Sequence, residues 1–212
     1  MRIITATMVL GAASVAANAG LVLTFNDVSG LSAEAEFTLI GPNTVEIRLR
    51  NTSTGAPLGF DGADQILTGL SWSGNGNTIL GGSAVIAAGS STVNFDSGTY
   101  GAGTDVGGEW GYGNSATSGA LGNGISALTS SATAFGGPNL DGPASLDGPQ
   151  GGLVADPLVV SLGGQGAIQS EIIATINLSA SINEIGDLFG NDQLARVEFG
   201  SDAHFITVTV PA

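Results

Sequence analysis

The sequence predicts an all-β fold, an antiparallel, jelly-roll-like β-sandwich that carries one long glycine-rich excursion. Apolar and polar residues alternate with period two in several segments, which is typical of strands that bury one face. Glycine, asparagine and proline separate these segments, and no helical 3.6-residue repeat follows residue 19. Because strands with one apolar face need a second layer to cover them, we expect two packed sheets.

The clearest element is a hairpin of residues 33–40 and 44–50, with Gly41-Pro42-Asn43 as its turn. A three-residue loop pairs positions whose numbers sum to 84. This register sets Phe37 opposite Ile47, Leu39 opposite Val45, Glu36 opposite Arg48 and Glu34 opposite Arg50. Opposite charges directly across strands contribute about 0.2–1 kcal/mol each. We therefore expect these two arginines to have a structural role.

Further apolar runs continue the pattern along the chain. Strands are expected at 21–28, 65–72, 83–95, 172–180, 196–199 and 204–210. The last two form a predicted hairpin across Gly200-Ser201-Asp202, and residues 183–189 favour a single helical turn. Between about 98 and 152 the alternation weakens, and Gly, Ser, Ala and Pro dominate a long loop region.

The first 19 residues have the order of a secretory signal. Arg2 gives a positive start, residues 3–16 are apolar, and Ala17-Asn18-Ala19 fits a signal peptidase site. The apolar run is too short and wrongly flanked for a membrane anchor. We therefore expect signal peptidase as a partner during export, no stable membrane insertion of this chain, and a mature single domain at 20–212.

Composition excludes several function classes. The chain has 18 acidic residues and four basic ones, so removing Arg2 with the signal leaves 3 minus 18, a formal charge of −15. Such a chain is repelled by nucleic acid and by anionic membrane surfaces. Without cysteine it has no thiol nucleophile and no zinc–thiolate site. The single histidine, His204, lies in a predicted strand, so a Ser-His-Asp site is not expected and we predict a non-enzyme.

The excursion contains one candidate ligand-binding group, Glu109 with Trp110 and Tyr112. A carboxylate beside aromatic rings is typical of sugar binding and, with a second acid, of glycoside hydrolysis. Because no second acid can be assigned from the sequence, a carboxylate-dependent hydrolase is the weakest interpretation. The alternative, which we favour, is that these rings cover one end of the sandwich.

Two pairs of aspartates are candidate calcium ligands, Asp61 with Asp64 and Asp141 with Asp147. The second pair lies in two copies of Leu-Asp-Gly-Pro within GGPNLDGPASLDGPQGG, and neither pair has the spacing of an EF-hand. Asp bonds locally, Gly accepts positive φ and Pro fixes the exit direction, so each copy favours a turn. We expect a stiff connector whose leucines pack inward, with no cofactor, and keep calcium as the alternative.

Several segments together resemble a known family. They are GLSAEAEFTL with TVEIRLRNTS, then ADQILTGLSWS, EWGYG with GGPNLDGP, ARVEFGSD, and the final Val210-Pro211-Ala212. With the export signal, this pattern resembles the exosortase-dependent, PEP-CTERM-type surface proteins of Gram-negative bacteria. The family's sorting helix and arginine cluster, which follow a Val-Pro-x-Pro motif, are absent from this chain.

The resemblance implies a non-enzymatic protein, secreted or at the surface of a Gram-negative bacterium. Its expected role is structural or interactive, in the cell surface or extracellular matrix, with envelope or matrix polysaccharide as a partner. The alternative interpretation is a calcium- or carbohydrate-binding β-sandwich module. A calcium titration separates the two, since a bound ion stabilises the native state.

Overall fold

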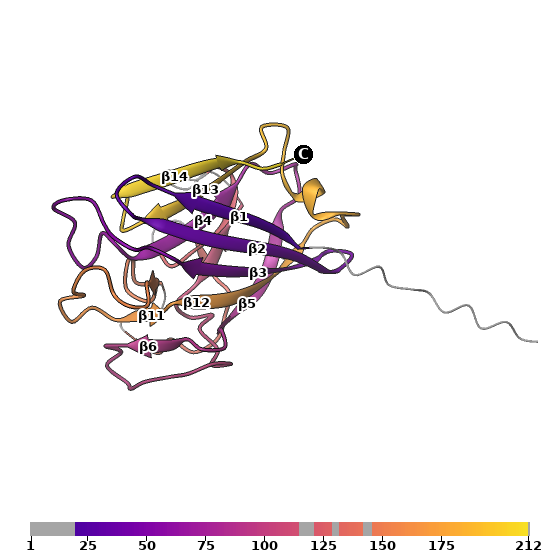
Figure 1. Cartoon of the computed structure of the whole chain (residues 1–212). Helices are drawn as coiled ribbons and strands as arrows, with labels where there is room; N and C mark the ends of the chain where they lie inside the picture. The colour runs from indigo at the N-terminus through magenta and orange to yellow at the C-terminus, as the bar shows by residue number, and fades with distance from the viewer. Residues whose placement is uncertain (1–19, 115–120, 129–131, 142–145, 212) are drawn as a thin grey trace, which may run out of the picture.

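The computed structural model of the chain describes residues 20–211 except 115–120, 129–131 and 142–145 (Figure 1). The expected signal segment, 1–19, lies outside the described residues. The fold is all-β and sandwich-like, as the alternation predicts, with two sheets packed together. Within the described residues, no helix is both long enough and apolar enough to cross a membrane.

The first sheet has five strands, each antiparallel to its neighbours. Their order is β1 (Leu21–Asn26), β2 (Ser32–Gly41), β3 (Thr44–Asn51), β12 (Glu171–Leu178) and β5 (Ile79–Ile86). Strand β12 alternates buried with partly exposed residues along most of its length, and β3 does the same. One face of this sheet therefore forms half of the core, while the other meets solvent.

The predicted hairpin is confirmed in every pair. Strands β2 and β3 set Phe37 opposite Ile47, Leu39 opposite Val45, Glu36 opposite Arg48 and Glu34 opposite Arg50. The register shifts only beyond Leu39, at the turn itself. Because a slip of one residue would expose the apolar face, side-chain alternation fixes this register.

The second sheet is assembled mostly from short strands. Its path is β6 (Ser91–Val93), β11 (Ala167–Gln169), β10 (Leu153–Val154), β4 (Leu67–Trp72), β8 (Asn123–Ser126), β7 (Gly111–Gly113) and β9 (Thr133–Ala134). Strand β13 (Leu194–Phe199) pairs with both β4 and β14 (His204–Thr209), which confirms the predicted final hairpin. Strands β10 and β11 run parallel, so this sheet is mixed.

Two features of the second sheet differ from the sequence expectation. The run at 83–95 is two strands, because Gly89 has φ +86 and turns the chain from β5 in one sheet to β6 in the other. The glycine-rich excursion also supplies β7, β8 and β9 to the sheet. Glycine is required in β7, since a Cβ on Gly111 would lie 2.3 Å from the Thr133 carbonyl oxygen. Strands this rich in glycine carry no alternation to detect.

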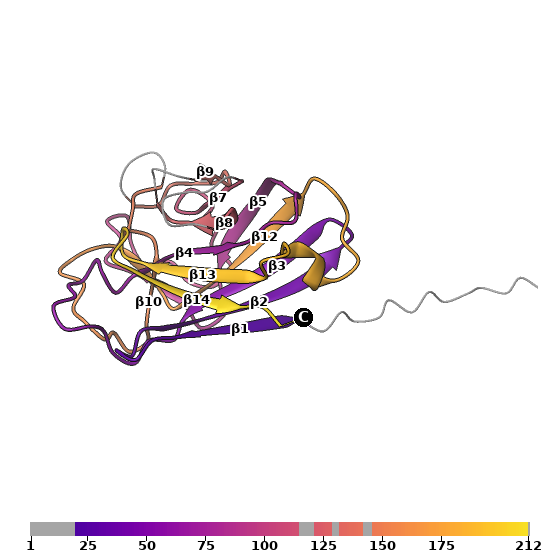
Figure 2. The same cartoon turned by 90° about the horizontal axis from the view of Figure 1, so that it is seen from above.

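The core lies between the two sheets and is centred on aromatic residues. The ring of Phe37 in β2 meets Trp72 in β4 edge-on at 5.7 Å, and meets Phe189 at 5.4 Å. Phe189 directly follows the 3₁₀ turn Ile185–Leu188, the single turn that the sequence favours. Strand β14 lies beside β1 where the sheet edges meet (Figures 1 and 2). The two sheets therefore share one apolar core.

Candidate functional site

The candidate functional site is a group of carboxylates inside the glycine-rich excursion. Glu109 lies in a turn before β7, where its N–H and that of Trp110 both donate to the Val106 carbonyl oxygen. Its side chain is fully buried. Oε1 of Glu109 accepts hydrogen bonds from the backbone N–H of Leu140 at 2.5 Å and of Asp141 at 3.3 Å. Glu109 thus ties the start of the excursion to the first Leu-Asp-Gly-Pro copy.

Asp141 is buried and bonds outside its own turn. Its Oδ1 accepts from the backbone N–H of Asp96 at 3.0 Å, and its Oδ2 accepts from Nε2 of Gln150 at 2.8 Å. A Cβ on Gly166 would lie 1.9 Å from Oδ2, so the backbone there approaches the carboxylate closely. The sequence interpretation assumed local turn bonding, whereas this aspartate connects three distant segments.

Asp147, in the second Leu-Asp-Gly-Pro copy, differs from Asp141 in its hydrogen bonding. Both of its carboxylate oxygens are buried without a hydrogen-bond partner among the described residues, and so is Oε2 of Glu109. Gly148 follows with φ +75, and the Gly152 N–H donates to the Pro149 carbonyl oxygen, so this copy does form a turn. The leucines of the two copies, Leu140 and Leu146, pack inward as expected. The Gly-Pro of the first copy lies outside the described residues.

Burial and mutual repulsion perturb these acids. Loss of solvent raises the pKa of Asp147 to about 7, with smaller contributions from the negative charges of Glu109 and Asp141. Burial also raises the pKa of Glu109, partly offset by the N–H groups of Leu140 and Asp141. Carboxyl groups whose pKa values are displaced together in this way are typical of functional sites.

The aromatic residues expected beside Glu109 do not form a sugar-binding platform. Trp110 is fully buried, and its Nε1 donates to the Gly151 carbonyl oxygen at 2.9 Å. The ring of Tyr112 stacks on Phe135 at 5.5 Å, and its hydroxyl donates to the Leu80 carbonyl oxygen. These rings cover the sandwich, which is the alternative that the sequence analysis favours.

The other calcium candidates, Asp61 and Asp64, cap one exposed turn. Oδ1 of Asp61 accepts from the N–H of Ala63 and of Asp64, and Oδ2 of Asp64 accepts from the N–H of Asp61. Their carboxylates are thus used by the turn itself. Across the described residues, no group of three or more His, Cys, Asp or Glu side chains has the arrangement of a metal site.

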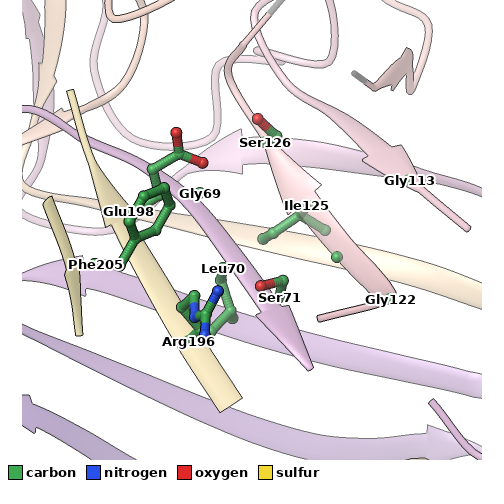
Figure 3. Close-up of a pocket in the computed structure, with 11 residues that line it drawn as sticks. Gly69, Leu70, Ser71, Gly113, Gly122, Ile125, Ser126, Arg196, Glu198 and Phe205 are labelled. Atoms are coloured by element: carbon green, nitrogen blue, oxygen red, sulfur yellow. The ribbon is translucent and has the colours of Figure 1, made fainter. Parts of the chain in front are cut away.

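A shallow groove on the outer face of the second sheet was not anticipated (Figure 3). Its floor is made of small residues that face outward from β4, β8 and β7, with Ser71 and Gly124 as examples. Its wall comes from the final hairpin, where the guanidinium of Arg196 lies 5.6 Å from the ring centre of Phe205. Beside them Glu198 accepts a hydrogen bond from the Asp202 N–H.

Burial also changes the pKa of Glu198, the carboxylate of the groove. Loss of solvent is the largest cause that raises the pKa of Glu198 to about 7, and the charge of Asp202 adds to it. The groove therefore places a guanidinium, a titratable carboxylate and an aromatic ring together. Part of this group could be predicted from the sequence, because Arg196 and Glu198 are two positions apart and so share one face of the predicted hairpin.

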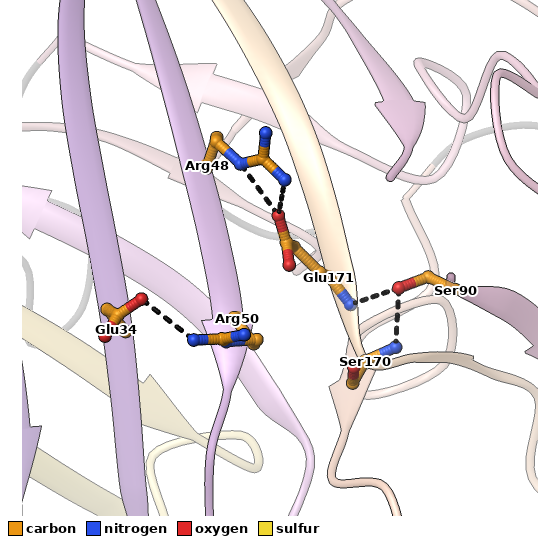
Figure 4. A network of polar contacts seen from close by, with 6 residues as sticks. All are labelled: Glu34, Arg48, Arg50, Ser90, Ser170 and Glu171. Carbon is orange, nitrogen blue, oxygen red and sulfur yellow. Dashed lines mark hydrogen bonds and ion pairs between the residues drawn. The ribbon is translucent and has the colours of Figure 1, made fainter. Parts of the chain in front are cut away.

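A polar network covers the outer face of the first sheet (Figure 4). Arg50 bonds Glu34 at 3.0 Å, as predicted, but Arg48 bonds Glu171 of β12 at 2.6 Å through Nη2. The hydroxyl of Ser90 accepts from the N–H of Ser170 and of Glu171, each at 3.1 Å. This network ties β3 and β12 to the turn after β5, so its polar groups have structural partners.

His204 also has a structural partner. Its Nε2 lies 3.0 Å from Oδ2 of Asp27, and its ring meets Phe60 edge-on at 6.1 Å. The contact joins the start of β14 to the loop after β1. The only histidine thus contributes to packing at one end of the sandwich.

Comparison with known proteins gives no family for this chain. No family model, no curated protein and no solved structure matches it. The fold and the site define a cysteine-free, acidic, sandwich-like β-protein that buries carboxylates in its glycine-rich excursion.

Proposed function

We propose that the chain is an exported, non-enzymatic protein with a structural or interaction role at the cell surface or in the extracellular matrix. The carrying observation is the junction between the signal-like segment and the fold. Ala17-Asn18-Ala19 is followed by Gly20, and the first strand begins at Leu21. Cleavage after Ala19 would thus release a chain whose first strand is intact and paired with β2 along its whole length.

The placement of polar side chains supports a structural role. The arginines of β3 pair with Glu34 and Glu171 across the sheet face, and His204 pairs with Asp27. Side chains that satisfy one another in this way stabilise the scaffold. The resemblance to exosortase-dependent surface proteins belongs to this proposal, and so does a polysaccharide of the envelope or matrix as partner.

Mass spectrometry of the protein recovered from the medium or the envelope of a Gram-negative host tests export. A mature N-terminus at Gly20 is expected. Replacing Ala17 and Ala19 with leucine should block cleavage, because signal peptidase requires small residues there. Ala12→Leu is the matched control, since it keeps the run apolar and should leave cleavage unchanged. Recovery of intact Met1 from the parent's envelope fraction would contradict the proposal.

The DNA downstream of codon 212 tests the sorting part separately. Codons for an apolar helix followed by arginines would support exosortase-dependent anchoring. A stop codon directly after Ala212 would instead restrict the proposal to a secreted protein.

A further inference from the structure

Three buried oxygens stand out because the described residues offer them no hydrogen bond. They are Oε2 of Glu109 and both carboxylate oxygens of Asp147. Glu109 itself has no exposed surface. A buried ionised carboxylate is strongly disfavoured unless it is paired, protonated or bound to a metal ion. These oxygens are therefore either protonated or bound by something besides the polar groups of the described residues.

The positive side chains of the mature protein are occupied elsewhere. Arg48 bonds Glu171, Arg50 bonds Glu34, and Arg196 lies on β13 in the groove wall. The mature chain contains three arginines and no lysine. A cation from solution is thus the remaining source of positive charge that does not require moving a strand.

We propose that Glu109 and Asp147 bind a divalent cation, with calcium as the favoured ion. Calcium takes carboxylate and carbonyl oxygens from flexible loops, and these two acids come from the glycine-rich excursion. Asp141 is a positioning residue, because both of its oxygens already accept hydrogen bonds from Asp96 and Gln150. Because no group of three or more His, Cys, Asp or Glu side chains in the described residues has the arrangement of a metal site, the proposal assigns the ion two carboxylate ligands only.

Two local features favour an ion at this point. Gly151 has φ +77, and a Cβ there would lie 3.2 Å from Oε2 of Glu109, so glycine keeps this side of the carboxylate open. Oε1 of Glu109 is held by the N–H of Leu140 and of Asp141, which leaves Oε2 as the oxygen for a ligand. The site is therefore oriented by backbone contacts before any ion arrives.

The ligand set indicates a modest affinity. Calcium needs six to eight oxygens, so backbone carbonyls and water must complete the shell around two carboxylates. Extracellular calcium modules bind with dissociation constants of about 10⁻⁴–10⁻³ M. The inference goes beyond the proposed function and reverses the sequence expectation that Asp147 only shapes a turn. It does not depend on export, because calcium binding is measured on the purified protein.

Thermal melting of the purified protein at pH 8 tests the site. Calcium chloride at about 10 mM, compared with EGTA, should raise the Tm of the parent by about 3–6 °C. The same concentration of magnesium should give a smaller shift, because magnesium dehydrates reluctantly and demands octahedral geometry. Isothermal titration of the parent with calcium chloride gives a readout that needs no variant.

Asp147→Asn is the decisive variant. It removes charge and keeps size, so in EGTA its Tm should equal or exceed that of the parent, while the calcium shift should disappear. Asp61→Asn is the matched control in another aspartate turn, and it should keep the full shift. The proposal is overturned if calcium gives neither heat nor a Tm shift in the parent. It is equally overturned if Asp147→Asn retains the shift, or if Asp61→Asn abolishes it.

Discussion

Arg48 on β3 donates to Glu171 on β12 from Nε at 2.9 Å and from Nη2 at 2.6 Å, although Glu36 lies directly opposite Arg48 on β2. The side chain of Glu171 is 12% exposed, against 41% for Arg48. Hydrogen bonds to this carboxylate are the largest cause that raises the pKa of Arg48. The pair of Arg48 with Glu171 is thus partly shielded from water, and an ion pair gains more where solvent screens it less.

This geometry predicts unequal coupling of Arg48 to its two acidic neighbours. In double-mutant cycles with Arg48→Met, the pair with Glu171→Gln should show a coupling free energy of about 1 kcal/mol. The pair with Glu36→Gln should show a smaller one, because the charge of Glu36 acts on Arg48 less strongly than the hydrogen-bonded Glu171 does. Urea denaturation at low salt measures both cycles. Adding about 1 M NaCl should reduce the larger coupling. Equal couplings would mean that the solution structure follows the direct cross-strand pairing.

The first sheet shows how far local pattern determines structure. The β2–β3 hairpin could be predicted residue by residue, since alternation and a three-residue loop are both local features. The partner of Arg48 could not, because Glu171 is 123 positions away along the chain and reaches β3 only through sheet assembly. Sequence therefore predicts which residues share a face, while the choice of ionic partner depends on the third strand.

The candidate site, unlike the first sheet, could not be predicted from local pattern. Glu109 and Asp147 were both named from the sequence, but for different sites, and their proximity depends on how a glycine-rich connection folds. Glycine carries no alternation, so β7, β8 and β9 leave no period to read. The sequence does show that acids greatly outnumber bases. From this excess one expects that some carboxylates, if buried, have no arginine partner.

The raised pKa of Glu198 predicts a pH-dependent stability. A carboxyl group with pKa about 7 in the folded protein and an ordinary lower value when unfolded binds its proton more tightly in the folded state. The free energy of unfolding should therefore rise as pH falls from about 8 to about 5, on the order of 2 kcal/mol from this group. Urea denaturation at pH 5.5 and pH 8 measures the difference.

Glu198→Gln should reduce this dependence by the contribution of Glu198, because the amide does not titrate, while Asp147, whose pKa burial also raises to about 7, continues to contribute. Asp192→Asn, at an exposed carboxylate, is the control and should leave the slope unchanged. If the parent and Glu198→Gln lose the same stability between the two pH values, Glu198 is ionised in the folded protein at pH 5.5 and the prediction is wrong.

Close backbone contact beneath the carboxylate cluster makes Gly108 intolerant of substitution. A Cβ on Gly108 would lie 2.3 Å from the Pro138 carbonyl oxygen, so Gly108→Ala must push apart two loop segments of the excursion. Overpacking of this kind costs about 2–3 kcal/mol. Gly101→Ala is the matched control, since a Cβ there meets nothing within 4 Å, and it should change stability by about 0.5 kcal/mol or less. Thermal melting of the two variants checks the contrast, and equal Tm values would contradict it.

Asn51, at the end of β3, joins the two sheets, and its removal should destabilise the whole sandwich. Its buried Nδ2 donates to the carbonyl oxygens of Leu153 at 2.9 Å and Gln65 at 3.3 Å, while its Oδ1 accepts from the Ser53 N–H. Asn51→Ala leaves these buried groups without partners, which should cost about 2–4 kcal/mol. Asn177→Ala, at an exposed asparagine of β12, is the control and should cost about 0.5 kcal/mol or less. Urea denaturation of both variants measures the difference, and a near-neutral Asn51→Ala would show that water replaces the amide between the sheets.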